Sequence, residues 1–142
     1  MTTTQGTPPV PHYACAFLVR DNTVLLGLRA PHRKRAPNLW DVIGGLVEPD
    51  ETVADALIRE LKEELGVVAT DFTEIGTVAL PPDPPWPPAL CHMHLVRCWT
   101  GGEPAIQDDE HVRIAWFALA DALALDLALP DYRDLLRRIL TA

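Results

Sequence analysis

A helix with clear signals at both ends constrains the fold of this chain more than any other feature of its sequence. From Thr52 to Leu65 the apolar residues recur every three or four positions, which is the spacing of one helix face. Thr52 followed three residues later by Asp55 resembles a capping box with Asp in the place of Glu, and Gly66 suits the left-handed residue that ends a helix. The sequence therefore predicts an amphipathic helix over 52–65, whose apolar face has to pack on another layer.

Runs of strand-forming residues surround this helix. Residues 12–19 and 24–28 predict a β-hairpin, because Asp21 and Asn22 between them favour a turn. The other expected strands are 39–43, 72–80, 90–99 and 112–117, and the expected closing helices are 120–127 and 132–140. Strands that are interrupted by one helix and followed by further helices indicate a mixed α/β sandwich.

The length of 142 residues and the hydrophobic content of 48% suit one domain with a substantial core. We expect residues 1–11 to form a flexible N-terminal tail and residues 12–142 to form the single domain. Residues 81–88 contain six prolines, which lack the N–H group that strand pairing needs. This segment is therefore expected to be a stiff, exposed loop between two strands.

The charge of the chain narrows the class of ligand. A formal net charge of −8 argues against binding that depends on the phosphates of a nucleic-acid duplex. It does not exclude a small nucleotide, because a bound divalent metal can reverse the local sign of an acidic site. We therefore expect a nucleotide partner and no nucleic acid, and a homodimer remains open.

Cysteine usage and hydropathy bear on the cellular setting. The three cysteines include no Cys-x-x-Cys pair, so the sequence indicates neither a disulfide framework nor a zinc site, and we expect reduced thiols. No stretch reaches the roughly 18 apolar residues of a membrane span, and residues 1–9 lack the pattern of a secretory leader. These features predict a soluble, cytoplasmic protein without a membrane partner.

The helix predicted over 52–65 carries three glutamates on one face. At 100° per residue, Glu60, Glu63 and Glu64 fall within an arc of about 100°. A hard divalent cation such as Mg²⁺, which binds carboxylate oxygens, would relieve their mutual repulsion. The alternative is a solvated acidic face, on which Arg59 would be an ordinary surface ion-pair partner.

Residues 45–67 resemble the Nudix box, whose pattern is Gly-x5-Glu-x7-Arg-Glu-U-x-Glu-Glu-x-Gly-U with U an aliphatic residue. Every specified position matches, and agreement at all the fixed identities is expected by chance on the order of once in 10⁸ starts. The resemblance implies a Nudix-type α/β/α sandwich with a mixed sheet, and Mg²⁺-dependent hydrolysis of a pyrophosphate bond. One departure is Ile43, where many members of the family have proline before the two glycines.

The resemblance also implies the roles of individual residues. The implied metal ligands are the carbonyl of Gly44 and the carboxylates of Glu60, Glu63 and Glu64. Among them Glu63 and Glu64 are similar to the main ligands, and Glu60 to a further ligand or a water-orienting carboxylate. Arg59 is expected to hold the glutamates by charge-assisted hydrogen bonds, with support from Glu51. Mn²⁺ is an alternative to Mg²⁺ in such a site.

Glu110 is the candidate acid/base group outside the box. It lies in a short acidic loop before Trp116 and Phe117, and this spacing is similar to that of the family's distal acidic residue. The alternative is a loop that faces solvent. In that case the base belongs to the box, and Glu60 is the first candidate.

Four residues are candidates for binding the substrate. Arg29 ends a strand and begins a basic loop, so it resembles a family position that contacts substrate phosphate; the alternative is a solvated loop. His92 and His94 alternate onto one strand face and are candidates for a base pocket, or else ordinary sheet-surface histidines. Trp86 in the proline-rich segment is a candidate to stack on a base, or else an ordinary loop residue.

The first substrate class that we expect is a nucleoside triphosphate, including oxidised or other noncanonical forms. ADP-ribose or another nucleotide sugar is the second. A non-catalytic nucleotide sensor with the same fold is the alternative from another class, and the intact set of box glutamates argues against it.

Overall fold

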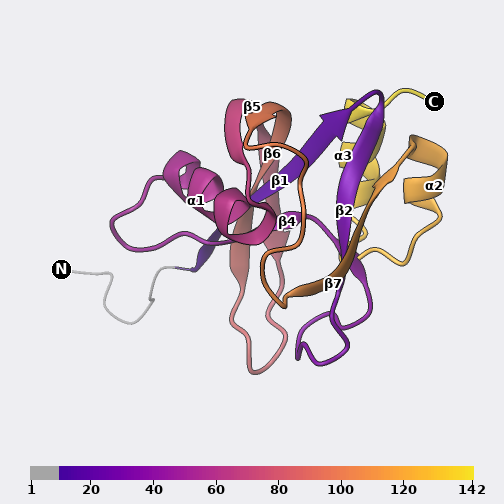
Figure 1. The fold of residues 1–142 in the computed structure, drawn as a ribbon. Coiled ribbons are helices and arrows are strands. Elements are labelled where there is room, and N and C mark those ends of the chain that lie inside the picture. Colours follow the sequence, from indigo (N-terminus) through magenta and orange to yellow (C-terminus); the bar gives the residue numbers. More distant parts are fainter. Residues whose placement is uncertain (1–9) are drawn as a thin grey trace.

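The computed structural model describes residues 10–142, which form a mixed sheet of seven strands with three helices (Figure 1). The strands are β1 His12–Arg20, β2 Thr23–Arg29, β3 Trp40–Asp41, β4 Ile43–Leu46, β5 Val68–Leu80, β6 Ala89–Thr100 and β7 His111–Phe117. The helices are α1 Val53–Leu65, α2 Leu119–Leu123 and α3 Tyr132–Ile139. Most of the expected N-terminal tail lies outside the described residues.

Strand β1 is central to the sheet because it pairs with three neighbours. It runs antiparallel to β2 and β4 and parallel to β6. Strand β5 pairs antiparallel with β6, while β3 and β7 both pair antiparallel with β2. The predicted hairpin is present, and both turn residues have positive φ, 52° at Asp21 and 58° at Asn22, as a tight two-residue turn requires. The mixed α/β sheet is therefore confirmed.

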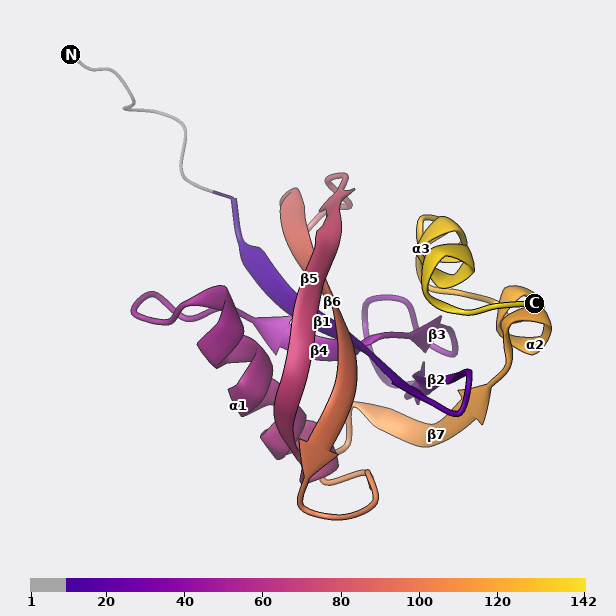
Figure 2. The same cartoon turned by 90° about the horizontal axis from the view of Figure 1, so that it is seen from above.

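Two hydrophobic cores lie on the two faces of this sheet, because successive residues of a strand point to opposite faces. On β1, Ala14 and Ala16 pack in one core with α1, whereas Cys15 and Phe17 pack in the other with α3. Figure 2 shows α1 on one side of the sheet and α2 with α3 on the other. The sandwich thus has α1, the sheet, and the closing helices as its three layers.

Helix α1 begins and ends as its sequence predicts. The Thr52 hydroxyl accepts a hydrogen bond from the backbone N–H of Asp55 at 3.1 Å, which satisfies one of the free donors of the first turn. Gly66 follows the helix in the left-handed region with φ of 74°, and its N–H bonds to the Lys62 carbonyl. No helix within residues 10–142 is long and apolar enough to cross a membrane.

Helix α2 is shorter than the expectation for 120–127. It ends at Leu123, because the following backbone pairs with Trp40 instead of continuing the helix. The Trp40 N–H donates to the Asp126 carbonyl at 2.9 Å, and the Ala128 N–H donates to the Trp40 carbonyl at 2.7 Å. These long-range bonds draw the segment before α3 towards the end of β2 and β3.

The proline-rich segment forms the exposed loop that was expected between β5 and β6. Its two residues other than proline, Asp83 and Trp86, exchange backbone hydrogen bonds of 3.0 and 2.8 Å. They are the only residues of the segment that have an N–H group to donate. This pair closes the loop and leaves the Trp86 side chain half-buried against the body of the protein.

Candidate active site

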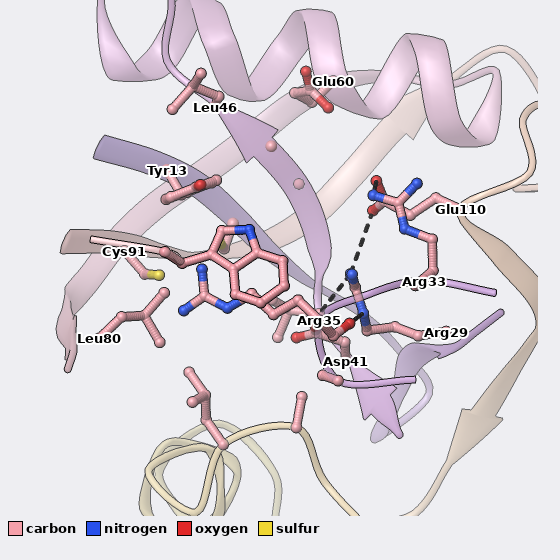
Figure 3. A pocket seen from close by; sticks show the side chains of 18 of the residues that line it. Tyr13, Arg29, Arg33, Arg35, Asp41, Leu46, Glu60, Leu80, Cys91 and Glu110 are labelled. Atoms are coloured by element: carbon pink, nitrogen blue, oxygen red, sulfur yellow. Dashed lines mark hydrogen bonds and ion pairs between the residues drawn. The ribbon is translucent and has the colours of Figure 1, made fainter. Parts of the chain in front are cut away.

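A cavity of about 690 Å³ lies beside the ends of β2, β3 and β4 (Figure 3). Helix α1 contributes Glu60 to it, the end of β2 contributes Arg29, and the basic loop after β2 contributes Arg33 and Arg35. Its opposite wall consists of side chains from β1, β5 and β6, together with the proline-rich loop. The cavity therefore has a charged side and a mainly apolar side.

Arg59 organises the carboxylates of α1. Its Nε and Nη2 donate to the two oxygens of Glu51 at 2.6 and 2.9 Å, and its Nη1 donates to Glu60 at 2.6 Å and to Glu63 at 3.0 Å. Nη2 also donates to the Leu46 carbonyl at 3.0 Å, which ties α1 to β4. The hydrogen bonds from Arg59 are the main cause that lowers the pKa of Glu51 to about 2.

The three box glutamates do not have equivalent surroundings. Glu63 is half-exposed on the outer side of Arg59, while the Glu60 carboxylate packs directly over Gly45. A Cβ atom at residue 45 would overlap that carboxylate, so glycine at this position lets Glu60 lie against the strand. Burial raises the pKa of Glu60 although Arg59 opposes the shift. Of these two glutamates, only Glu60 lines the cavity.

Glu64 is the most unusual group of the site. Its side chain is 4% exposed, and neither carboxylate oxygen has a hydrogen-bond partner among the described residues. Burial raises the pKa of Glu64 to about 11, and the charges of Glu110 and then Glu60 add to the shift. A buried carboxylate without a partner is costly unless a cation balances it. Its environment therefore fits a divalent metal.

Two neighbours from the start of β7 complete this cluster. Glu110 and His111 each offer one ligand atom within 4.8 Å of the others and of Glu64. His111 is buried, its Nδ1 lies 3.9 Å from Glu64 and its Nε2 lies 4.0 Å from Glu110. Burial lowers the pKa of His111, which favours the neutral imidazole that metals bind. His111 was not predicted as a site residue from the sequence, although it directly follows Glu110.

The basic loop reaches the same carboxylates. Arg29 is 12% exposed; its Nη1 lies 3.7 Å from Asp41 and 4.0 Å from Glu110, and its Nε donates to the Arg35 carbonyl. Arg33 adds a contact of 3.6 Å to Glu110. Arg29 is therefore anchored at the cavity, which excludes the alternative of a fully solvated residue. The acidic loop likewise turns Glu110 inward, since only 26% of its side chain is exposed.

The far end of the cavity combines aromatic side chains with one buried carboxylate. Trp86 lines it as the sequence suggested, with the Arg35 guanidinium 5.9 Å from its ring centroid. Asp41 accepts a hydrogen bond from the Tyr132 hydroxyl at 2.6 Å. Burial raises the pKa of Asp41, and the bond from Tyr132 opposes that shift. Asp41 and Tyr132 were not foreseen, because they are far apart in sequence and only the fold joins them.

His92 and His94 do not line this cavity, which corrects the base-pocket expectation. On β6 the residues that face the cavity side are Cys91 and Met93, so the alternating histidines point to the opposite face of the sheet. There His94 is buried with its Nδ1 3.1 Å from the Cys15 carbonyl, and His92 contacts His12 at 2.9 Å. Their alternative interpretation, as histidines of the sheet, is the one that the geometry supports.

Comparisons with known proteins agree with this arrangement. The model of the NUDIX domain family matches residues 10–139. The CTP pyrophosphohydrolase of Escherichia coli is 35% identical over 118 residues, which is 82% of each chain. The NAD-capped RNA hydrolase NudC of Pseudomonas aeruginosa is 31% identical over 87% of this chain, which spans only 40% of that relative. A MutT NUDIX hydrolase from Burkholderia pseudomallei superposes with a TM-score of 0.79 at 27% identity, covering 94% of this chain and all of the other.

Proposed function

The chain belongs to the Nudix family of hydrolases, and we propose that it hydrolyses a pyrophosphate bond of a nucleoside triphosphate with Mg²⁺. The observation that carries this proposal is the buried carboxylate of Glu64, which has no hydrogen-bond partner within residues 10–142, beside a cavity with a cationic side and an aromatic side. The similarity to a CTP pyrophosphohydrolase over most of both chains supports a triphosphate substrate.

The residues that would hold the metal are Glu64, Glu60 and His111, together with Glu63 and the Gly44 carbonyl, which the resemblance implies as ligands. A divalent metal in this site supplies positive charge that neutralises the diphosphate and activates the attacking water. Arg59 keeps Glu60 and Glu63 in fixed orientations by donating hydrogen bonds to both. The chain thus contributes a preorganised set of oxygen ligands.

We assign the proton-accepting role to Glu110. Its carboxylate lies beside Glu64 but is partly exposed, so a water molecule can reach it. Arg33 and Arg29 hold it from the other side, at 3.6 and 4.0 Å. A positioned base of this kind takes the proton of the water as its oxygen attacks phosphorus. Glu60 is the alternative base, since it also lines the cavity.

The two sides of the cavity suggest how the substrate is oriented. Arg29 and Arg33 can bind phosphate oxygens on the charged side, where guanidinium groups make paired hydrogen bonds. Trp86 and Tyr13 offer flat apolar surfaces at the other end, which suit a nucleobase. The triphosphate would then lie against the carboxylate cluster with the base near the proline-rich loop.

A nucleotide with a diphosphate bridge, such as ADP-ribose, remains the second candidate. The similarity to the NAD-capped RNA hydrolases favours it, because NAD itself contains a diphosphate that joins two nucleosides. A panel of nucleoside triphosphates, oxidised triphosphates and nucleotide sugars distinguishes the candidates when the products are identified by mass. We expect a triphosphate to give the highest kcat/KM, with a monophosphate and pyrophosphate as products.

Excess EDTA should abolish turnover of every substrate in that panel, and Mg²⁺ or Mn²⁺ should restore it. The reason is that the metal supplies the positive charge that the substrate's phosphates and the attacking water need, and no other group of the carboxylate cluster can replace it. Phosphate-release assays after addition of EDTA, and again after addition of metal, measure this directly. Full turnover with EDTA present would contradict the proposal.

Replacing Arg29 by Ala should lower kcat/KM for a triphosphate more than for a substrate with fewer phosphates. We expect a loss of about tenfold or more for the triphosphate, because a charge-assisted hydrogen bond contributes roughly 1.5–3 kcal/mol. Arg137→Ala is the matched control, since Arg137 lies on the exposed side of α3 and, in the part of the chain that the structure describes, pairs only with Asp134. An equal loss for both substrates would mean that Arg29 supports Asp41 and Glu110 without contacting phosphate.

A further inference from the structure

Arg35 differs from the other two arginines that line the cavity. Arg29 and Arg33 both contact Glu110, at 4.0 and 3.6 Å. Arg35 is half-buried, but within residues 10–142 it forms no ion pair and its side chain donates no hydrogen bond. Its guanidinium carbon lies instead 5.9 Å from the centre of the Trp86 ring, over the face of that ring. The donors of this guanidinium are therefore available to a ligand in the cavity.

Arg35 and Trp86 come from two loops whose backbones are both fixed. In the proline-rich loop, Trp86 exchanges backbone hydrogen bonds with Asp83. In the basic loop, the Arg35 carbonyl accepts a hydrogen bond of 2.9 Å from Nε of Arg29. The long Arg35 side chain, in contrast, has several rotatable bonds. Any change in the distance between the two groups is therefore expected from movement of the guanidinium.

The spacing of these two flat groups is close to what one aromatic ring needs between them. Carbon atoms in contact lie about 3.5 Å apart, so two groups that enclose a planar base are separated by roughly 7 Å. The observed distance of 5.9 Å is short of this value by only about 1 Å. A small rotation of the Arg35 side chain would therefore admit a base. Both a guanidinium and an indole ring stack favourably on the face of a base.

We propose that Arg35 and Trp86 clamp the nucleobase of the substrate between them. That the ligand is a nucleotide rests on the proposed function, in which Arg35 has no role. Stacking on both faces of the base uses the π-surface that every base has, so the clamp recognises the presence of a base and tolerates both purines and pyrimidines. It thus distinguishes a nucleoside triphosphate from a polyphosphate that has no base.

Arg29 connects the clamp to the carboxylate cluster. Its Nε bonds to the Arg35 carbonyl, while its Nη1 lies 4.0 Å from Glu110. Figure 3 shows Arg29 beside Glu110, and the Arg35 side chain directed towards the wall that contains Cys91 and Leu80. A nucleotide whose base lies in the clamp would therefore extend its phosphates along Arg29 towards the carboxylates.

Binding of substrate analogues by Arg35→Ala tests the clamp without hydrolysis. The probes are the α,β-methylene analogues of ATP and CTP with Mg²⁺, and inorganic tripolyphosphate is the probe without a base. In isothermal titration calorimetry, Arg35→Ala should bind both analogues about tenfold more weakly than the native protein does, because it loses one stacking face. Its affinity for tripolyphosphate should not change. Arg113→Ala is the matched control, since Arg113 lies 5.7 Å from the Trp40 ring in the same kind of contact and neither residue lines the cavity.

Conservative variants separate stacking from charge. Arg35→Lys keeps the positive charge but lacks the flat guanidinium, so it should restore only part of the affinity for the analogues. Trp86→Phe keeps an aromatic ring and should bind them almost as tightly as the native protein, whereas Trp86→Ala should bind them as weakly as Arg35→Ala. Circular dichroism confirms that the variants are folded. If Arg35→Lys has the full native affinity, or if Arg35→Ala weakens tripolyphosphate as much as the analogues, Arg35 attracts phosphate by its charge and the clamp is refuted.

Kinetics distinguish failure of the clamp from failure of the proposed function. With ATP and CTP, Arg35→Ala should raise KM about tenfold and change kcat little, because the clamp contacts no reacting atom. If Arg35→Ala keeps the native KM, the clamp fails and the function stands. If the native protein binds the analogues in an Arg35-dependent way but hydrolyses neither ATP nor CTP, the proposed function fails and the clamp stands. Absence of binding by every probe would overturn both.

Discussion

Replacing Glu64 by Gln should lower kcat by at least about 10²-fold while the fold is retained. The amide keeps the shape of the side chain but removes the charge that a buried cation needs, so the transition state loses its electrostatic support. Steady-state kinetics with saturating Mg²⁺ measure the effect. Glu48→Gln is the matched control, because Glu48 is exposed near Arg59 and does not line the cavity.

The same substitution, Glu64→Gln, should make the metal-free protein more stable, although it lowers activity. In the folded state the pKa of Glu64 is about 11, far above its ordinary value of 4.5. Above pH 4.5 the unfolded chain ionises first, so the native protein loses stability as the pH rises towards 11. Glu64→Gln lacks this loss and should be the more stable form at pH 8 in EDTA, with a smaller difference at pH 5.

Denaturant unfolding with and without Mg²⁺ separates the two roles. Added Mg²⁺ should stabilise the native protein, because a ligand that binds only the folded state shifts the equilibrium. It should stabilise Glu64→Gln much less. If Glu64→Gln keeps the native kcat and is stabilised by Mg²⁺ as much as the native protein, Glu64 is not a metal ligand.

Glu110→Gln is expected to lower kcat by about 10²- to 10⁴-fold, the range of a positioned general base. The acidic limb of the pH profile of kcat should also disappear, since that limb reports protonation of the base. The matched control is Asp109→Asn, the adjacent carboxylate, which is 89% exposed and contacts only His32 among the described residues. We expect the control to keep kcat within a few fold of the native value.

The comparison of Glu110→Gln with Glu60→Gln assigns the base. If Glu110 is the base, its variant loses the acidic limb while Glu60→Gln keeps the limb and shows weakened binding of Mg²⁺. If Glu110→Gln leaves kcat and its acidic limb unaltered and Glu60→Gln abolishes turnover, the base lies inside the box. In that case Glu60 would be the base, and its packing against Gly45 would hold its carboxylate in position.

Features of this protein that have local causes could be predicted from the amino-acid sequence. Thr52, Asp55 and Gly66 predicted both ends of α1, because capping and left-handed termination depend on neighbouring residues only. The spacing along that helix placed its glutamates and Arg59 on one face for the same reason. The box pattern added the family, and the comparisons confirm it.

Which groups from distant segments lie together depends instead on how the strands pair and pack. The pairing of β6 in the sheet places Cys91 on the face towards the cavity and His92 and His94 on the opposite face. The alternation of residues in the sequence shows that the histidines share a face, but it does not show which face that is. The pairing of β7 with β2 brought His111 and Glu110 to Glu64, and the fold joined Asp41 to Tyr132 across 91 residues. Burial where these segments pack together shifts the pKa values of Glu64, His111 and Asp41, because the loss of water around a group depends on every segment that covers it.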